Sequence, residues 1–148
     1  MCKPSSQDLD SDESVRVAFV CVRNAGRSQI AAAFAEREIR RRGKEDQVEI
    51  ATGGTRPAEK IHDVVVEAME KEEFDLSRRT PREISIKELE SFDLVATMGC
   101  SSLDLNELDG SVELRVWNVN DPGGESLDRV MEIRDEIETR VSSLLDEL

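Results

Sequence analysis

With 148 residues, the chain is close to the commonest size of a single domain, so we expect one domain with one hydrophobic core. Its formal net charge is −13, and its cations comprise 15 Arg but only 5 Lys. This acidity argues against nucleic acid as a partner, because a polyphosphate backbone would be repelled. The same balance is typical of a halophilic protein that stays soluble in concentrated salt, and an ordinary acidic cytosolic protein is the alternative.

The N-terminal segment 1–14 is rich in Ser and Asp, which predicts a disordered acidic tail before a folded domain at 15–148. The chain has neither a long apolar run nor the apolar core of a signal peptide, so we expect a cytoplasmic protein without membrane association. Its three cysteines, Cys2, Cys21 and Cys100, lack metal-ligand spacing and companion histidines. We therefore expect no metal, no cofactor, and one or two functional thiols in a reducing compartment.

Strand and helix patterns alternate through the first half of the domain. The apolar run at 15–21 predicts a buried strand, and 28–43 predicts a helix that closes at a terminal glycine. A short strand at 48–52 is followed by "GGT", which indicates a turn. The next helix is predicted by apolar residues at helical spacing: Ile61, Val64, Val65, Ala68 and Met69. We assign His62, the only histidine, to the start of this helix rather than to catalysis.

The second half continues the alternation. Ser85 and Glu88 have capping-box spacing for a short helix, and the runs at 92–98 and 112–117 predict two more strands. A final helix is predicted to begin after a Ser126 cap, with one apolar face made by Val130, Ile137, Val141, Leu144 and Leu148. Strands separated by helices predict an α/β fold with right-handed crossovers and a parallel sheet covered on both faces.

The stretch "CVRNAGRS" at 21–28 has the spacing C-x5-R and leads from a strand into a helix. Such a turn can direct successive backbone N–H groups inward, and with the helix N-terminus it forms a cradle for a tetrahedral oxyanion. The sheet geometry agrees, because ligands of parallel sheets bind at the carboxyl ends of the strands. The predicted oxyanion-binding loop comprises Val22, Arg23, Asn24, Ala25, Gly26, Arg27 and Ser28.

Individual side chains of this stretch suit the attack of a sulfur on an anion. Arg27 could reach back across the loop and hold two oxygens with its planar guanidinium. Ser28 can donate a hydrogen bond to the Cys21 sulfur, which favours a nucleophilic thiolate. Asn24 and Gly26 tolerate the left-handed backbone that a tight loop requires. The alternative is that Cys21 is a small buried hydrophobe at a strand end.

A proton donor for the leaving oxygen is available in "NVNDPGG" at 118–124, which places Asp121 after the fourth strand. The alternative is an Asp-Pro turn without chemistry. The chain has no tyrosine, and its single tryptophan, Trp117, lies on a predicted strand. Aromatic walls that would stack on a phosphotyrosine ring are therefore scarce, which favours a small inorganic oxyanion or a non-aromatic phosphoester.

Together these residues resemble the low-molecular-weight protein tyrosine phosphatase superfamily, which includes the thioredoxin-type arsenate reductases. The resemblance covers roughly residues 15–145 and is carried by "FVCVRNAGRSQIAAAF", "ATGGTRPAEKIHDVVVEAMEKEEFDLS", "DLVATMGC" and "WNVNDPGG". It implies a single-domain three-layer sandwich with a four-stranded parallel sheet flanked by helices. It also implies Cys21 as nucleophile, Arg27 as oxyanion clamp and Asp121 as general acid.

Within this superfamily, "CVRNAGRSQIAAAF" and "TMGC" are more similar to the arsenate reductase branch. Cys100 stands where that branch has a cysteine that attacks the arsenylated nucleophile, releases arsenite and leaves a disulfide. The further cysteine usual in that branch is missing from "CSSLDLNELDG". Cys2 or an external thiol must then finish the cycle, or thioredoxin must reduce a Cys21–Cys100 disulfide directly. An unreactive packed thiol is the alternative for Cys100.

These observations predict an arsenate reductase that binds arsenate or phosphate, with thioredoxin or a low-molecular-weight thiol as reductant. A protein tyrosine phosphatase that forms a phosphocysteine is the close alternative. A non-catalytic oxyanion-binding module is a further alternative, and such a module would not need Asp121.

Overall fold

The computed structural model describes residues 14–99 and 110–148. Four parallel strands form one sheet with the order β2-β1-β3-β4. The strands are β1 (Val15–Cys21), β2 (Val48–Gly54), β3 (Leu94–Met98) and β4 (Glu113–Val116). The predictions for Cys2 and for Cys100 fall outside the described residues.

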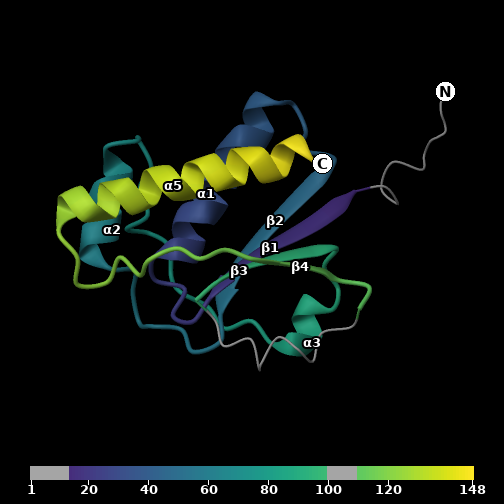
Figure 1. Ribbon diagram of the computed structural model, residues 1–148, viewed down its shortest axis with the longest axis horizontal. Helices are drawn as coiled ribbons and strands as arrows, with labels where there is room; N and C mark the ends of the chain where they lie inside the picture. Colours follow the sequence, from purple (N-terminus) through teal and green to yellow (C-terminus); the bar gives the residue numbers. More distant parts are fainter. Residues whose placement is uncertain (1–13, 100–109) are drawn as a thin grey trace.

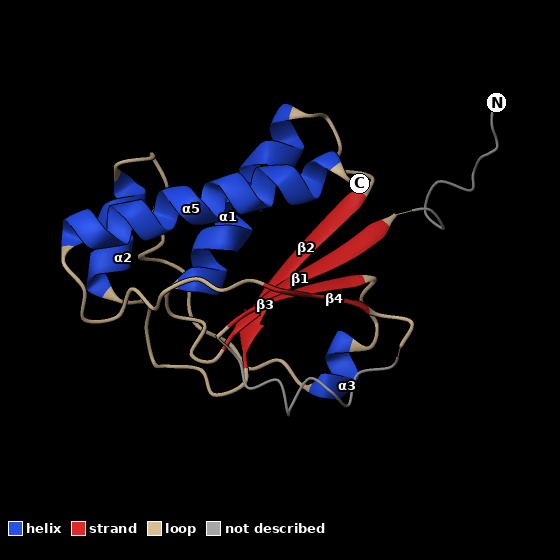
Figure 2. Ribbon diagram, viewed as in Figure 1, coloured by secondary structure: helices blue, strands red, loops and turns tan. Residues whose placement is uncertain are grey.

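Helices cover both faces of the sheet (Figures 1 and 2). The long helices lie together over one face, and they are α1 (Arg27–Arg41), α2 (Asp63–Glu70) and α5 (Leu127–Asp146). The short helix α3 (Ile86–Leu89) lies on the other face. This arrangement confirms the predicted three-layer α/β architecture with a four-stranded parallel sheet.

The central position of β1 explains its sequence. Five consecutive residues of β1, and all of β3, are buried, as expected of parallel strands covered on both faces. Phe19 faces the larger core under the long helices, whereas Ala18 and Val20 face a smaller core on the α3 side. The Phe19 ring packs on Trp117 with 5.9 Å between ring centroids. Trp117 follows β4 directly, so the prediction that it lies on this strand is wrong by one residue.

Side-chain caps fix the starts of two helices as predicted. The Ser85 hydroxyl accepts a hydrogen bond from the Glu88 amide, and the Ser126 hydroxyl accepts one from the Arg129 amide. The predicted glycine stop of α1 is also confirmed in position, because Gly43 has a φ of 67° just beyond the last turn. The helix itself begins one residue earlier and ends two residues earlier than predicted.

The prediction of a turn at "GGT" is wrong, because Gly53 and Gly54 are the last two residues of β2 and pair with the end of β1. Close packing explains these glycines. A β-carbon placed on Gly54 would lie 2.6 Å from the Val22 carbonyl oxygen, and one placed on Gly53 would lie 2.6 Å from Ile84 Cβ. Glycine at these two positions lets other segments of the same chain approach the strand closely, which is a common reason for glycine within a strand. The strands β3 and β4 are also shorter than predicted, by two residues each.

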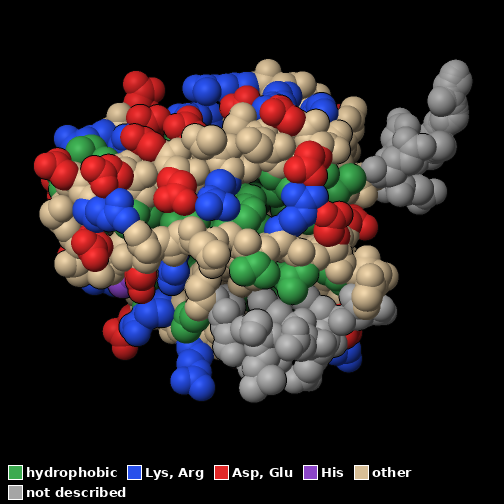
Figure 3. All heavy atoms as spheres, in the orientation of Figure 1, with side chains coloured by type: hydrophobic (Ala, Val, Ile, Leu, Met, Phe, Trp, Pro, Cys, Tyr) green, Lys and Arg blue, Asp and Glu red, His purple; other side chains and the backbone are tan. Residues whose placement is uncertain are grey.

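Acidic and basic side chains intermingle over the surface seen in Figure 3. Arginine supplies most of the pairs with carboxylates; on the edge strand β4, Arg115 bonds to both Glu113 and Glu147. The hydrogen bond from Arg115 lowers the pKa of Glu147, because it stabilises the ionised carboxylate. No helix in residues 14–99 and 110–148 is both long and apolar enough to cross a membrane.

Candidate active site

Cys21 ends the central strand at the carboxyl edge of the sheet, where β2 and β3 flank β1 on either side. The chain then turns through residues 22–26 and enters α1 at Arg27. The predicted oxyanion-binding loop therefore occupies the step from a central parallel strand to a helix N-terminus. That is the position where open α/β sheets bind ligands and where a helix dipole favours an anion.

The Cys21 sulfur is buried and receives polar contacts from its own loop. Its Sγ lies 2.8 Å from the Ser28 hydroxyl oxygen, and the Asn24 amide donates to Sγ over 3.2 Å. The Asn24 side-chain amide donates in turn to the Ser28 oxygen over 2.7 Å, which leaves the Ser28 hydrogen free to point at the sulfur. The predicted contact between Ser28 and Cys21 is thus confirmed. Donors directed at sulfur favour a thiolate.

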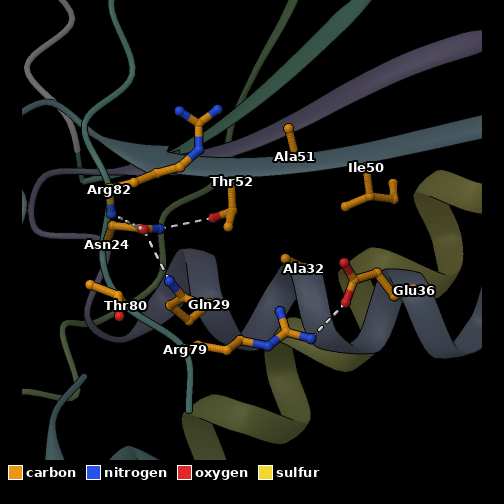
Figure 4. Close-up of a pocket in the computed structure, with 10 residues that line it drawn as sticks. All are labelled: Asn24, Gln29, Ala32, Glu36, Ile50, Ala51, Thr52, Arg79, Thr80 and Arg82. Carbon is orange, nitrogen blue, oxygen red and sulfur yellow. Dashed lines mark hydrogen bonds and ion pairs between the residues drawn. The ribbon is translucent and has the colours of Figure 1, made fainter. Parts of the chain in front are cut away.

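Asn24 joins the loop to three other segments. With a φ of 52° it adopts the predicted left-handed conformation, and its side chain is fully buried. Its Nδ2 also donates to the Thr52 hydroxyl on β2, and its Oδ1 accepts from Gln29 Nε2 on α1 and from the Arg82 amide. Figure 4 shows these bonds converging on Asn24 at one end of a pocket behind the loop. Sequence reasoning missed this network, because its partners are distant in the chain.

Replacing Asn24 with alanine is expected to lower the free energy of unfolding by about 2–4 kcal/mol. The variant leaves several buried partners without a hydrogen bond, and alanine tolerates the left-handed backbone less well than asparagine. Asn24→Gly is the matched control, since it removes the same side chain and relieves the backbone, and we expect it to recover about 1 kcal/mol. Urea unfolding measures both variants. Parent-like stability of Asn24→Ala would show that the network contributes nothing.

Gly26 serves a different purpose from the predicted one. Its φ is −146°, so it does not adopt the left-handed conformation expected for it. Instead, a β-carbon placed on Gly26 would lie 2.8 Å from Pro122 Cγ and 3.5 Å from His62 Cδ2. Glycine is needed here because two other segments pack directly against the loop.

The Arg27 side chain reaches the segments that follow β3 and β4. Its guanidinium donates to the Val119 carbonyl over 3.0 Å, and its Nη2 lies 3.8 Å from Asp121 Oδ2. The guanidinium also packs on Gly99, which has a φ of 82° and no side chain to displace it. Only 13% of the Arg27 side chain is exposed. The structure therefore brings the predicted clamp and the predicted acid together.

Asp121 forms the turn that its sequence allowed and directs its carboxyl group toward Arg27. Its Oδ1 accepts a hydrogen bond from the Gly123 amide over 2.9 Å, which forms the expected Asp-Pro turn. Its Oδ2 faces Arg27, and 59% of its side chain is exposed. The turn therefore presents the carboxyl group beside the guanidinium and open to solvent.

His62 lies closer to this site than the sequence suggested. It occupies the position before α2, as predicted, but its ring also lies near Gly26 and Gly123, since β-carbons placed there would lie 3.5 Å from Cδ2 and 3.1 Å from Nε2. The one sequence feature that hints at this position is that His62, a residue type that caps helices poorly, stands at a helix start. In the described part of the chain, no cluster of His, Cys, Asp and Glu side chains is suited to hold a metal ion.

Comparisons with known proteins agree with this geometry. The model of the low molecular weight phosphotyrosine protein phosphatase family matches residues 16–148. A Halobacterium salinarum protein named "Putative arsenate reductase" is 56% identical, over 94% of this chain and 96% of the relative. "Arsenate reductase 2" of Staphylococcus epidermidis is 31% identical, over 86% of this chain and 93% of the relative.

Two solved structures share the fold. A low molecular weight protein tyrosine phosphatase from T. tengcongensis superposes with a TM-score of 0.78 at 22% identity, covering 91% of this chain and 100% of the other. The thioredoxin-dependent arsenate reductase of Corynebacterium glutamicum gives 0.74 at 28% identity, covering 93% of this chain. This chain spans 63% of that longer chain. The family match across nearly the whole chain, with the fold and the loop geometry, shows that the chain belongs to the low molecular weight phosphotyrosine protein phosphatase family.

Proposed function

We propose that this chain is an arsenate reductase that works through a covalent adduct on Cys21. The observation that carries the proposal is the buried Cys21 sulfur at the N-terminus of α1. This sulfur contacts the Ser28 hydroxyl and accepts a hydrogen bond from the Asn24 backbone amide. A sulfur in that setting is a nucleophile held beside an anion site. The names of the Halobacterium and Staphylococcus relatives support arsenate as the anion.

In the first step, the Cys21 thiolate attacks arsenic and forms an S–As bond, while one arsenate oxygen leaves. Asp121 supplies the proton that lets this oxygen depart as water. Arg27 and the N–H groups of the loop hold the remaining oxygens and balance their charge. The position of Asp121 supports this assignment, because its Oδ2 lies 3.8 Å from Nη2 of the anion clamp Arg27.

In the second step, the Cys100 thiolate attacks the Cys21 sulfur. A disulfide forms, the S–As bond breaks with its electron pair going to arsenic, and arsenite leaves. Arsenic is reduced from the +5 to the +3 state, and the two thiols are oxidised. The role of Cys100 rests on the resemblance of "TMGC" to the reductase branch, since Cys100 lies outside the described residues.

The disulfide requires a thiol reductant, and we assign thioredoxin or a low-molecular-weight thiol to this role. The thioredoxin-dependent Corynebacterium relative supports the first choice. Because such thiol systems keep the cytoplasm reduced, we propose a cytoplasmic location for a single domain at 15–148.

The deciding experiment assays arsenate with thioredoxin, and an aryl phosphate without reductant, at low and at molar salt. In Cys100→Ser, thiol-coupled arsenite production should fall to background, while aryl phosphate hydrolysis stays within about twofold, because only reduction needs a second thiol. Cys2→Ser is the matched control, and normal turnover in it places the relay on Cys100. Unchanged arsenate turnover in Cys100→Ser would contradict the relay.

A phosphatase activity is the second candidate, favoured by the family match over residues 16–148. Phosphate and arsenate have the same shape and charge, so the same loop serves both. The absence of tyrosine from the chain leaves few aromatic walls for a phosphotyrosine ring, which favours non-aromatic phosphoesters. Turnover in either assay excludes a non-catalytic binding module.

A further inference from the structure

The imidazole of His62 lies between two loops at the carboxyl edge of the sheet. A β-carbon placed on Gly26 would lie 3.5 Å from His62 Cδ2, and one placed on Gly123 would lie 3.1 Å from His62 Nε2. The backbone of His62 is hydrogen-bonded to the first of these loops as well, since its amide donates to the Ala25 carbonyl over 3.0 Å. A single residue thus contacts both loops.

The start of α2 does not account for this imidazole. His62 occupies the N-cap position, yet its side chain makes no capping hydrogen bond. Ser, Thr, Asp and Asn are preferred there because their short side-chain oxygen accepts a bond from the first turn. The histidine side chain is instead half-buried and turned toward the loops. Its contacts therefore point to a role outside the helix.

The imidazole and the Asp121 carboxyl group lie on the same side of Gly123. Asp121 Oδ1 and His62 Nε2 both lie within 3.2 Å of the point that a Gly123 β-carbon would occupy. The carboxyl group is held on two further sides, by the Gly123 amide at 2.9 Å and by Arg27 Nη2 at 3.8 Å. The imidazole therefore borders the same space beside Gly123 as this carboxyl group.

Pro122 packs beside the imidazole on the same glycine of the first loop, with its Cγ 2.8 Å from a β-carbon placed on Gly26. We propose that His62 is a positioning residue for Asp121, a wedge between Gly26 and Gly123 that fixes the carboxyl group relative to the bound anion. The inference rests on the proposed function, since it takes Asp121 as the proton donor. It predicts an effect on the loss of the leaving oxygen and none on anion binding.

The variant His62→Ser tests this role, because it removes the ring and installs a good N-cap. We expect a melting temperature close to that of the parent. For arsenate with a thiol reductant, kcat should fall about tenfold, since small displacements of a catalytic group are costly, while KM stays within about twofold. In an Asp121→Asn background the same substitution should change kcat less than about twofold, because nothing is left to position.

Aryl phosphates give a second readout that a structural role would not reproduce. Phenyl phosphate has a more basic leaving group than 4-nitrophenyl phosphate, so its hydrolysis depends more on a proton donor. The decrease in kcat caused by His62→Ser should therefore be larger for phenyl phosphate than for 4-nitrophenyl phosphate. Lys60→Ala is the control, since Lys60 lies in the same segment, is exposed and pairs only with Asp63 among the described residues.

Two outcomes would overturn the inference: a parent-like kcat in His62→Ser, or an equal loss in the parent and Asp121→Asn backgrounds. Failure of the proposed function gives a different result. If Asp121→Asn itself turns over arsenate and phenyl phosphate like the parent, the assignment of the acid is wrong. If Asp121→Asn is impaired while His62→Ser is not, only the positioning role is wrong.

Discussion

Cys21→Ser is expected to eliminate both arsenate reduction and phosphoester hydrolysis, with kcat falling on the order of 10⁴-fold or more, as when other catalytic nucleophiles are removed. The Ser28 hydroxyl and the Asn24 amide contact the Cys21 sulfur, and a serine hydroxyl in the same place is a much weaker nucleophile than that sulfur. No sulfur adduct can then form. Initial rates with both substrates measure the loss, and mass spectrometry of protein quenched during turnover tests for the adduct.

The loss should not reflect unfolding. Cys21 is buried among polar partners that also accept a hydroxyl, so the free energy of unfolding should change by no more than about 1 kcal/mol. Cys2→Ser provides the matched substitution elsewhere in the chain. Residual turnover within about tenfold of the parent would place the nucleophile elsewhere and overturn the proposed mechanism.

Arg27→Lys is expected to lower kcat/KM for arsenate about 100-fold, although the positive charge is kept. The guanidinium donates to the Val119 carbonyl, packs on Gly99 and faces Asp121, all with one planar group. A lysine ammonium cannot reproduce this set, and it loses the two-point contact with an anion that a guanidinium makes. Loss of about two charge-assisted hydrogen bonds accounts for the expected size of the effect.

Steady-state kinetics with arsenate, together with inhibition by inorganic phosphate, measure this loss in both turnover and anion affinity. Arg40→Lys is the matched control, because it makes the same exchange at an exposed position of the same helix. Parent-like kcat/KM in Arg27→Lys would show that Arg27 acts as a simple charge and not as a clamp.

Local sequence was sufficient for the centre of the site. The contact of Ser28 with Cys21 and the left-handed Asn24 depend on a short strand–loop–helix segment, and the sequence of that segment predicts both. The hydrogen bonds from Asn24 to Thr52 and from the Arg82 amide join segments 28 and 58 residues apart. No local pattern encodes such pairs, because they arise only when the sheet is assembled.

Two differences between prediction and structure concern glycines, namely the expected turn at Gly53 and Gly54 and the expected left-handed Gly26. A glycine can mean a positive φ, a turn or a close approach of other atoms, and the sequence does not distinguish these causes. Gly53 and Gly54 make room within a strand, and Gly26 makes room for Pro122. The sequence predicts that His62 starts α2, but it does not predict that the ring lies near Gly26 and Gly123. Those two glycines are remote from His62 in the chain.

The parallel sheet divides the chemistry among its strand ends. Cys21 ends β1, His62 follows β2, Gly99 follows β3 and Asp121 follows β4. Because strand pairing holds the four ends in place independently of what each loop contains, one loop can be exchanged while the nucleophile stays where it is. In the proposed mechanism, changes confined to the segment after β3 decide whether water or a second thiol resolves the sulfur adduct. Such a layout offers a simple evolutionary route between hydrolases and reductases within one family.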